Sequence, residues 1–292
     1  MSFSYKVKKE LSALPFGSGD EIMAELYGII FFSGNSKNNK FVLSFENKFV
    51  ADRVWEMIQQ ILYSNDFSAK YFTDQKSHSK CTYKVEIKNN LSLFENYTDF
   101  QKDFLTDFLR GAFIICGSIT NPEAEYHLEF NISNQELCND LIYIFKSYES
   151  LSLNPGVTER RGNYVVYFKG SEKITDFLVL IGAKQCAMEL IQIKMVKEVR
   201  NNINRTTNFE TANISKVTTS ATKQIKAIKK IKNSEGGLGS LPEYLHETAK
   251  LRLSHPYLSL NELSKLYKNQ ISKSGVNHRL KKLIDMANEY YE

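Results

Sequence analysis

Residues 109–117 read Leu-Arg-Gly-Ala-Phe-Ile-Ile-Cys-Gly, and residues 26–34 read Leu-Tyr-Gly-Ile-Ile-Phe-Phe-Ser-Gly. Both stretches are apolar, helix-like runs with a glycine at the third position and another at the exit. The interval is 83 residues for either glycine, since 111 − 28 = 83 and 117 − 34 = 83. Self-similarity at a fixed spacing indicates that one supersecondary unit occurs twice.

The elements predicted after each stretch repeat in the same order. The first stretch is followed by a strand, an amphipathic helix and a hairpin, at 40–45, 47–63, and 69–73 with 82–87. The second is followed by the corresponding elements, at 118–130, 133–147, and 156–158 with 163–168. We therefore expect a duplicated α-β-β-α-β-β arrangement in the α+β class.

Composition favours a folded protein of two domains. The chain has 292 residues, of which 42% are hydrophobic and 24% charged, which is enough to build packed cores. No apolar run approaches the roughly 18 residues that a membrane span needs. The N-terminus has no apolar segment typical of a secretory signal. We expect a cytoplasmic, nucleoid-associated protein that does not enter a membrane.

The sequence contains no recognisable catalytic or metal-binding motif. The four cysteines are far apart and form no C-x-x-C pair, at Cys81, Cys116, Cys138 and Cys186. A P-loop, an H-E-x-x-H motif and a G-x-S-x-G motif are all missing from the sequence. We expect no metal, no cofactor and no enzymatic activity.

Positive charge is concentrated in the last third of the chain. Residues 184–292 hold 19 basic and 10 acidic residues, a net charge of +9, whereas residues 1–183 hold 19 and 23, a net charge of −4. In residues 214–230 an apolar stripe accompanies a basic one, formed by Lys216, Lys223, Lys226 and Lys230. This basic stripe is either a solvated face or a phosphate-facing surface, and the sequence does not choose between them.

The end of the chain has the pattern of a helix-turn-helix. A capping box of Ser259 and Glu262 opens a helix at 260–267, and after a tight connection Ser272 caps a basic helix at 273–290. The apolar positions predict the packing core of this motif: Leu260, Leu263, Leu266, Val276, Leu280 and Leu283.

Helical spacing assigns DNA-binding roles in the second helix of that motif. Four polar side chains fall on the face opposite the apolar one: Ser274, Asn277, His278 and Lys281. In a major groove Asn277 could pair with an adenine edge and Lys281 could reach guanine. Phosphate contacts are expected from flanking residues and from the helix N-terminus, namely Lys273, Arg279, Lys282 and Ser272.

The duplicated body resembles the LAGLIDADG homing-endonuclease fold, in which two motif helices pack along a pseudo-twofold axis. The resemblance implies that Gly28 and Gly111 permit close approach of these helices. Nuclease members carry a metal-binding acid just before the exit glycine. Here those positions hold Ser33 and Cys116, which implies that the fold is kept without the cleavage chemistry.

The chain resembles the WhiA family of bacterial regulators in three parts: the duplicated body, the polar run at 204–213 and the residues at 259–280. The resemblance implies a transcription regulator that binds double-stranded DNA and is linked to cell division and chromosome segregation, or to sporulation in some relatives. A further partner would be another transcription factor or RNA polymerase. Because duplication removes the need for a LAGLIDADG-type body to dimerise, we expect a monomer.

These features predict two domains. Residues 1–203 form the duplicated LAGLIDADG-like domain, with halves at about 20–99 and 100–185 and a connecting helix at 186–203. Residues 204–292 form an all-α DNA-binding domain, in which 204–213 is a linker or cap and the helix-turn-helix lies at about 259–290. Two alternatives remain: a residual LAGLIDADG-type endonuclease, and a protein-interaction scaffold with secondary DNA binding.

Overall fold

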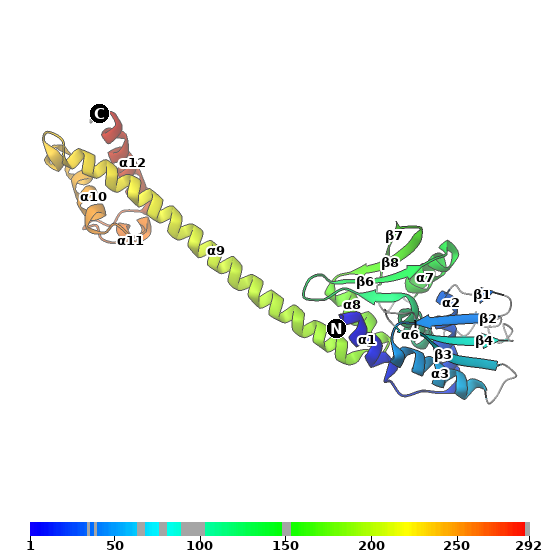
Figure 1. Cartoon of the computed structure of the whole chain (residues 1–292). Helices are drawn as coiled ribbons and strands as arrows, with labels where there is room; N and C mark the ends of the chain where they lie inside the picture. Colours follow the sequence, from blue (N-terminus) through cyan, green and yellow to red (C-terminus); the bar gives the residue numbers. More distant parts are fainter. Residues whose placement is uncertain are drawn as a thin grey trace. The chain divides into compact units, whose positions relative to one another are not determined.

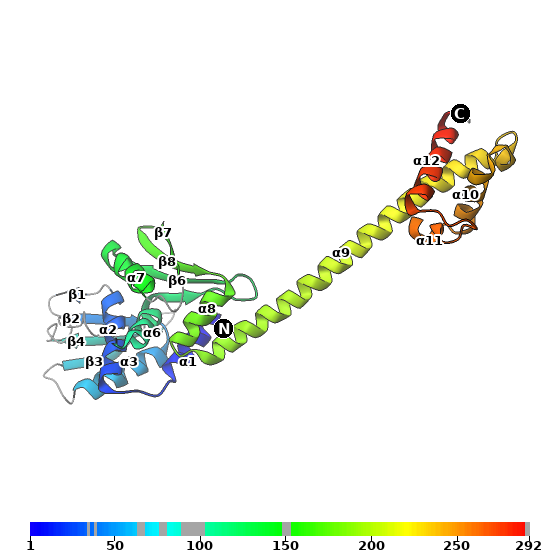
Figure 2. The same cartoon turned by 180° about the vertical axis from the view of Figure 1, so that it is seen from behind.

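The computed structural model describes residues 1–33, 36–37, 40–62, 68–75, 81–88, 103–147 and 153–289. They form two compact units, Met1–Glu198 and Val199–Glu292, here called unit 1 and unit 2. Each unit has its own hydrophobic core. Helix α9 (Lys184–Lys232) begins in unit 1 and ends in unit 2. The elements are labelled in Figure 1 and seen from behind in Figure 2.

Unit 1 is built from two halves with the same order of elements. After helix α1 (Phe3–Ser12), the first half contains α2 (Gly19–Ser33), β1 (Ser36–Lys37), β2 (Lys40–Phe45), α3 (Lys48–Leu62), β3 (Ser68–Gln75) and β4 (Cys81–Lys88). The second half contains α6 (Leu105–Cys116), β5 (Gly117–Ile119), β6 (His127–Ile132), α7 (Gln135–Ser147), β7 (Gly156–Arg160) and β8 (Asn163–Lys169), and α8 (Ser171–Leu180) follows it.

The two sheets confirm the duplication. Their strand orders are β1-β2-β4-β3 and β5-β6-β8-β7, with antiparallel neighbours throughout. Where β2 pairs with β4, Phe45 lies opposite Tyr83. Where β6 pairs with β8, Ile132 lies opposite Tyr164. The expected α-β-β-α-β-β order is therefore present twice, each time with its own four-stranded sheet (Figure 1).

Helices α2 and α6 pack backbone against backbone, as the family resemblance implied for Gly28 and Gly111. A Cβ atom on Gly28 would lie 2.2 Å from the Phe108 carbonyl oxygen, and one on Gly111 would lie 2.0 Å from the Glu25 carbonyl oxygen. Neither distance is compatible with a side chain, so both positions require glycine at this crossing. The exit glycine of the first stretch, Gly34, lies outside the described residues.

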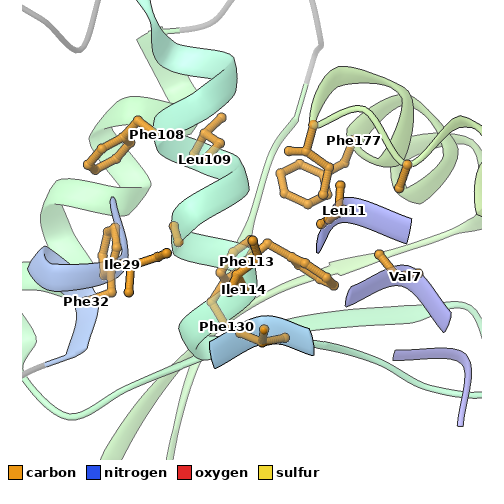
Figure 3. Close-up of a cluster of buried hydrophobic side chains, with 14 of the residues drawn as sticks. Val7, Leu11, Ile29, Phe32, Phe108, Leu109, Phe113, Ile114, Phe130 and Phe177 are labelled. Atoms are coloured by element: carbon orange, nitrogen blue, oxygen red, sulfur yellow. The ribbon is translucent and has the colours of Figure 1, made fainter. Parts of the chain in front are cut away.

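The α2–α6 pair lies at the centre of the unit 1 core. Figure 3 shows side chains of α6 extending in two directions, toward Ile29 and Phe32 on one side and toward α1 and Phe177 on the other. The ring centroids of Phe32 and Phe108 are 5.8 Å apart, and those of Phe113 and Phe177 are 6.0 Å apart. This seam therefore links the cores of the two halves.

A buried ionic network ties the first half of the seam together. Glu25 is 2% exposed and accepts hydrogen bonds from Arg53, at 2.7 and 2.8 Å, and from Arg110 at 3.2 Å. Arg110 also donates to Asp107 at 2.6 Å and to the Ile181 carbonyl at 2.8 Å. Burial raises the pKa of Asp107, and the charge of Arg110 offsets part of that rise. Glu25 and Asp107 are thus paired with arginines, and they lie away from the C-terminal ends of α2 and α6 at Ser33 and Cys116.

Unit 2 contains the end of α9, a 3-10 turn η2 (Gly237–Ser240), and helices α10 (Glu243–Ser254), α11 (Leu260–Ser264) and α12 (Lys273–Glu289). Its core is formed by buried side chains from all four helices, among them Ile228, Leu245, Leu263 and Leu280. An all-α domain therefore follows the α+β domain, as expected.

One expectation about unit 2 was wrong. Residues 204–213, expected as a linker or cap, lie inside the single helix α9, as do the expected connecting helix at 186–203 and the basic helix that follows. Polar composition suggested a break there. However, the sequence has no glycine or proline between Gly182 and Gly236, so nothing in the backbone forces the helix to end.

Candidate nucleic-acid interface

Helix α11, the first helix of the expected helix-turn-helix, is fixed by its N-terminal cap. The Ser259 hydroxyl accepts from the Glu262 backbone N–H at 3.3 Å, and the Glu262 carboxylate accepts from the Ser259 N–H at 2.8 Å. This is the capping box that the sequence predicted. The hydrogen bonds from Ser259 lower the pKa of Glu262, because they favour the ionised carboxylate.

A buried arginine supports the loop before α11. Arg252 is 1% exposed, and its guanidinium donates to the carbonyl oxygens of Leu258 at 2.8 Å and His255 at 3.4 Å. Burial lowers the pKa of Arg252. The sequence analysis missed this residue, although its spacing from Leu245 and Ala249 placed it on the inward face of α10.

Helix α11 is shorter than the predicted helix at 260–267, and this changes one core residue. It ends at Ser264, so residues 265–272 form the connection to α12. Leu266, predicted to be buried, is 43% exposed, whereas Tyr267 is 6% exposed. Because the helical turn stops at Ser264, the spacing that pointed Leu266 inward no longer applies. Leu263, Val276, Leu280 and Leu283 are buried, and Leu260 is half-buried against the same core.

Ser272 begins α12 as its N-cap. Its hydroxyl accepts from the Gly275 backbone N–H at 3.1 Å and lies 2.8 Å from the Ser274 hydroxyl. This geometry satisfies one of the free N–H groups of the first turn. It also engages Ser274 locally, although that residue was predicted to face the groove.

The remaining polar residues of that face project from α12 into solvent. Asn277, His278 and Lys281 are all exposed, and Lys273 is exposed at the first turn. The opposite side of the helix is buried in the unit 2 core through Val276, Leu280 and Leu283. Across residues 153–289 no hydrogen bond or ion pair is seen for the side chains of Asn277, His278 or Lys281, so their polar atoms are available to a ligand.

Arg279 and Lys282 are held by an aromatic residue of α10. The Lys282 ammonium donates to the Tyr244 hydroxyl at 2.9 Å and lies 5.7 Å from the centre of its ring. The Arg279 guanidinium lies 5.5 Å from the Tyr244 ring and 5.4 Å from the Tyr267 ring. These two cations therefore form one cluster with Tyr244, which sequence reasoning did not identify.

Ser33 and Cys116, the last residues of α2 and α6, stand at the positions where the resemblance implies a metal-binding acid in nuclease members. The Ser33 hydroxyl donates to the Ile30 carbonyl at 2.7 Å, and the Cys116 thiol lies 3.1 Å from the Ala112 carbonyl. Burial raises the pKa of Cys116 to about 12. Neither a thiol nor a neutral hydroxyl is the carboxylate ligand that Mg²⁺ usually takes from a protein. Burial also lowers the pKa of the nearby Lys8.

Between residues 1 and 289, outside the gaps given above, no group of three or more His, Cys, Asp or Glu side chains could hold a metal ion. Over those same ranges no helix has the length and hydropathy needed to cross a bilayer.

Two family models match the chain. Residues 105–200 match the model of the WhiA LAGLIDADG-like domain, and residues 203–287 match that of the WhiA C-terminal HTH domain. A relative from Clostridium botulinum, named "Probable cell division protein WhiA", is 35% identical over 314 residues, covering 99% of this chain and 98% of the relative. A relative of the same name from Clostridium novyi is 36% identical over 319 residues, with the same coverage of both chains.

Two solved structures are also similar. The crystal structure of full-length DUF199/WhiA from Thermatoga maritima has 31% sequence identity and a TM-score of 0.64, and all of both chains is covered. The crystal structure of the N-terminal LAGLIDADG domain of DUF199/WhiA has 26% identity and a TM-score of 0.54, covering 62% of this chain and 92% of that one.

Proposed function

The chain belongs to the WhiA family, and from this we propose that it is a sequence-specific DNA-binding transcriptional regulator whose recognition helix is α12. The observation that carries the proposal is the exposed face of Asn277, His278 and Lys281, which lies opposite the buried face of α12 in a helix-turn-helix domain. A second helix of this kind reads base edges in the major groove while neighbouring groups hold the backbone.

The side chains of α12 divide into two roles by their surroundings. Asn277 is free to make a bidentate pair with an adenine edge, and Lys281 is free to reach the O6 and N7 atoms of guanine. Lys273 and the first turn capped by Ser272 lie where a phosphate would be stabilised by the helix dipole. Arg279 and Lys282, held against Tyr244, provide a pre-ordered cationic cluster for a second phosphate.

The cellular role follows the family. Because relatives are named as probable cell division proteins, we propose that this regulator acts in cell division and chromosome segregation. It would work in the cytoplasm on the nucleoid, as a monomer, in contact with RNA polymerase or another transcription factor. Unit 1 would position or recruit without cleaving DNA, because Ser33 and Cys116 stand where carboxylates would be needed.

Replacing Asn277 with alanine tests base readout. We expect cognate binding to weaken by roughly 1–3 kcal/mol, about 5- to 150-fold, because a bidentate base contact is lost. Binding to random duplex should stay nearly unchanged, because phosphate contacts supply it. The measurement is the dissociation constant on a duplex recovered by selection from a random pool and on a scrambled duplex of the same length and composition, at one salt concentration.

Asn139→Ala serves as the matched control, because Asn139 is an exposed residue of helix α7 in unit 1. This variant should bind both duplexes like the wild type. Equal losses by Asn277→Ala on the selected and the scrambled duplex would show that Asn277 does not read bases.

A further inference from the structure

The densest positive charge in the chain lies outside the recognition helix. Residues 199–232 of α9 hold eight basic residues and a single acid, Glu210, a net charge of 8 − 1 = +7. Helix α12 holds four basic and two acidic residues, a net charge of 4 − 2 = +2. The end of α9 is therefore more strongly basic than the helix to which DNA reading is assigned.

Packing in unit 2 decides which way this charge points. The core buries one side of α9 through Ala227, Ile228 and Ile231. At 3.6 residues per turn Lys226 lies opposite this side, Lys223 and Lys230 lie next to Lys226 on the same surface, and all three are exposed. We call the surface formed by Lys223, Lys226 and Lys230 the α9 basic face.

The α9 basic face continues toward the start of unit 2 without an acid. Besides Ala212, the side chains there are basic, amide or hydroxyl groups, all exposed, and include Arg200, Asn201, Asn204, Asn208, Ser215, Thr219 and Thr222. Glu210 lies on the other side of the helix by its spacing from these residues. Amide and hydroxyl groups next to cations are the side chains that commonly bind phosphate oxygens.

Among the described residues no acid neutralises the lysines of this face. Across the described parts of the chain no ion pair involves Lys223, Lys226 or Lys230. Their neighbours three and four positions away on the helix include other lysines and no acid. Like charges at such spacings destabilise a helix by about 0.2–0.5 kcal/mol per pair.

The helix dipole explains only part of this charge. It stabilises cations in the last turn, which accounts for Lys229, Lys230 and Lys232. It does not account for Lys223 and Lys226, which lie farther from the C-terminus. A solvated surface helix usually alternates charges of both signs, and this face does not. A polyanion would relieve the repulsion between these lysines.

We propose that the α9 basic face binds the backbone phosphates of duplex DNA and forms a second contact surface beside α12. This inference rests on the proposed function, because the same unit carries the helix-turn-helix that selects duplex DNA as the polyanion. A contact between a lysine and a phosphate is one between point charges, and it carries no information about the base sequence. The α9 basic face therefore supplies affinity for any duplex, whereas α12 supplies the choice of sequence.

The test is the full-length triple variant Lys223→Gln, Lys226→Gln and Lys230→Gln. Glutamine keeps a helix propensity close to that of lysine, and circular dichroism checks that α9 is retained. The matched control removes three charges from exposed lysines of unit 1, in the variant Lys9→Gln, Lys146→Gln and Lys184→Gln. Both variants and the wild type are titrated with a scrambled duplex and with a selected duplex over a range of salt concentrations.

We expect the slope of log K against log salt to become shallower by about 0.9 × 3 ≈ 2.7 in the α9 variant, because three phosphate contacts are lost. Affinity for both duplexes should fall by the same factor, and the unit 1 variant should behave like the wild type. An α9 variant with the wild-type slope overturns the inference. The inference is also overturned if the α9 variant loses binding to anionic phosphatidylglycerol vesicles while its binding to both duplexes is unchanged.

The outcomes separate this inference from the function on which it rests. If the wild type binds neither duplex, the proposed function fails. If the wild type binds both and Asn277→Ala loses only the selected duplex, but the α9 variant binds like the wild type, the function stands and the α9 contact is wrong.

Discussion

Replacing Gly111 with alanine should break the closest backbone approach in unit 1. The added Cβ atom would lie 2.0 Å from the Glu25 carbonyl oxygen and 3.0 Å from the Ile29 backbone nitrogen. Both neighbours belong to the backbone of α2, so relief requires the two helices to separate. Separation would also disturb the buried pairing of Arg110 with Glu25, which spans the same crossing at 3.2 Å.

The magnitude follows from two opposing effects. Overpacking of a tight core costs up to about 3 kcal/mol. Alanine regains about 1 kcal/mol of helix propensity over glycine. We therefore expect a net loss of about 2 kcal/mol in the free energy of unfolding of unit 1. With a urea dependence of about 2 kcal/mol per M, the unfolding midpoint should fall by about 1 M.

The assay is urea unfolding followed by tryptophan fluorescence. Trp55 is the single tryptophan of the chain and lies on α3, so the signal reports unit 1 alone. Gly19→Ala is the matched control, because it is the same substitution in α2 with nothing within 4 Å of the new Cβ atom. A Gly111→Ala midpoint equal to those of the wild type and Gly19→Ala would refute the close-packing argument.

Two further predictions concern the cap of α11 and the seam exit. Because hydrogen bonds lower the pKa of Glu262 below its ordinary value of 4.5, the capping box should stabilise unit 2 above that pH, and its contribution should be lost as the pH falls through the lowered value. Thermal unfolding of the wild type and Glu262→Gln should therefore differ near pH 6, and the difference should shrink as the pH falls below 4.5; a difference that does not change with pH would contradict the assignment. At the seam exit, Ser33 and Cys116 predict that the purified chain does not nick supercoiled plasmid with Mg²⁺ or Mn²⁺. Chelator-sensitive nicking above that of a mock preparation would restore the nuclease alternative.

The sequence was sufficient for the duplicated fold because its signals are local and periodic. The stretches matched around Gly28 and Gly111 predicted the duplication, and the short strands and amphipathic helices after them predicted the repeated α-β-β-α-β-β order. The close helix crossing came from the resemblance to the LAGLIDADG fold. The capping box at Ser259 was equally local, since all of its atoms come from four consecutive residues. The capping box and the order of helices and strands are thus readable from short stretches of sequence.

The ionic and aromatic contacts that sequence reasoning missed join residues that are distant in the chain, and the other differences concern where helices end. Arg53 and Arg110 converge on Glu25 from different helices. Tyr244 of α10 contacts Arg279 and Lys282 of α12. The exposure of Leu266 follows from the early end of α11. The polar composition of 204–213 predicted a break, but helix α9 continues through it.

The central claim is that the exposed face of α12 selects a DNA sequence. Its most direct test is the ratio of two dissociation constants of the full-length chain at one salt concentration, one for a duplex recovered by selection from a random pool and one for its scrambled counterpart. The account predicts that the selected duplex binds about 10³-fold or more tightly. A ratio near 1, or a selection that yields no common sequence, would contradict it.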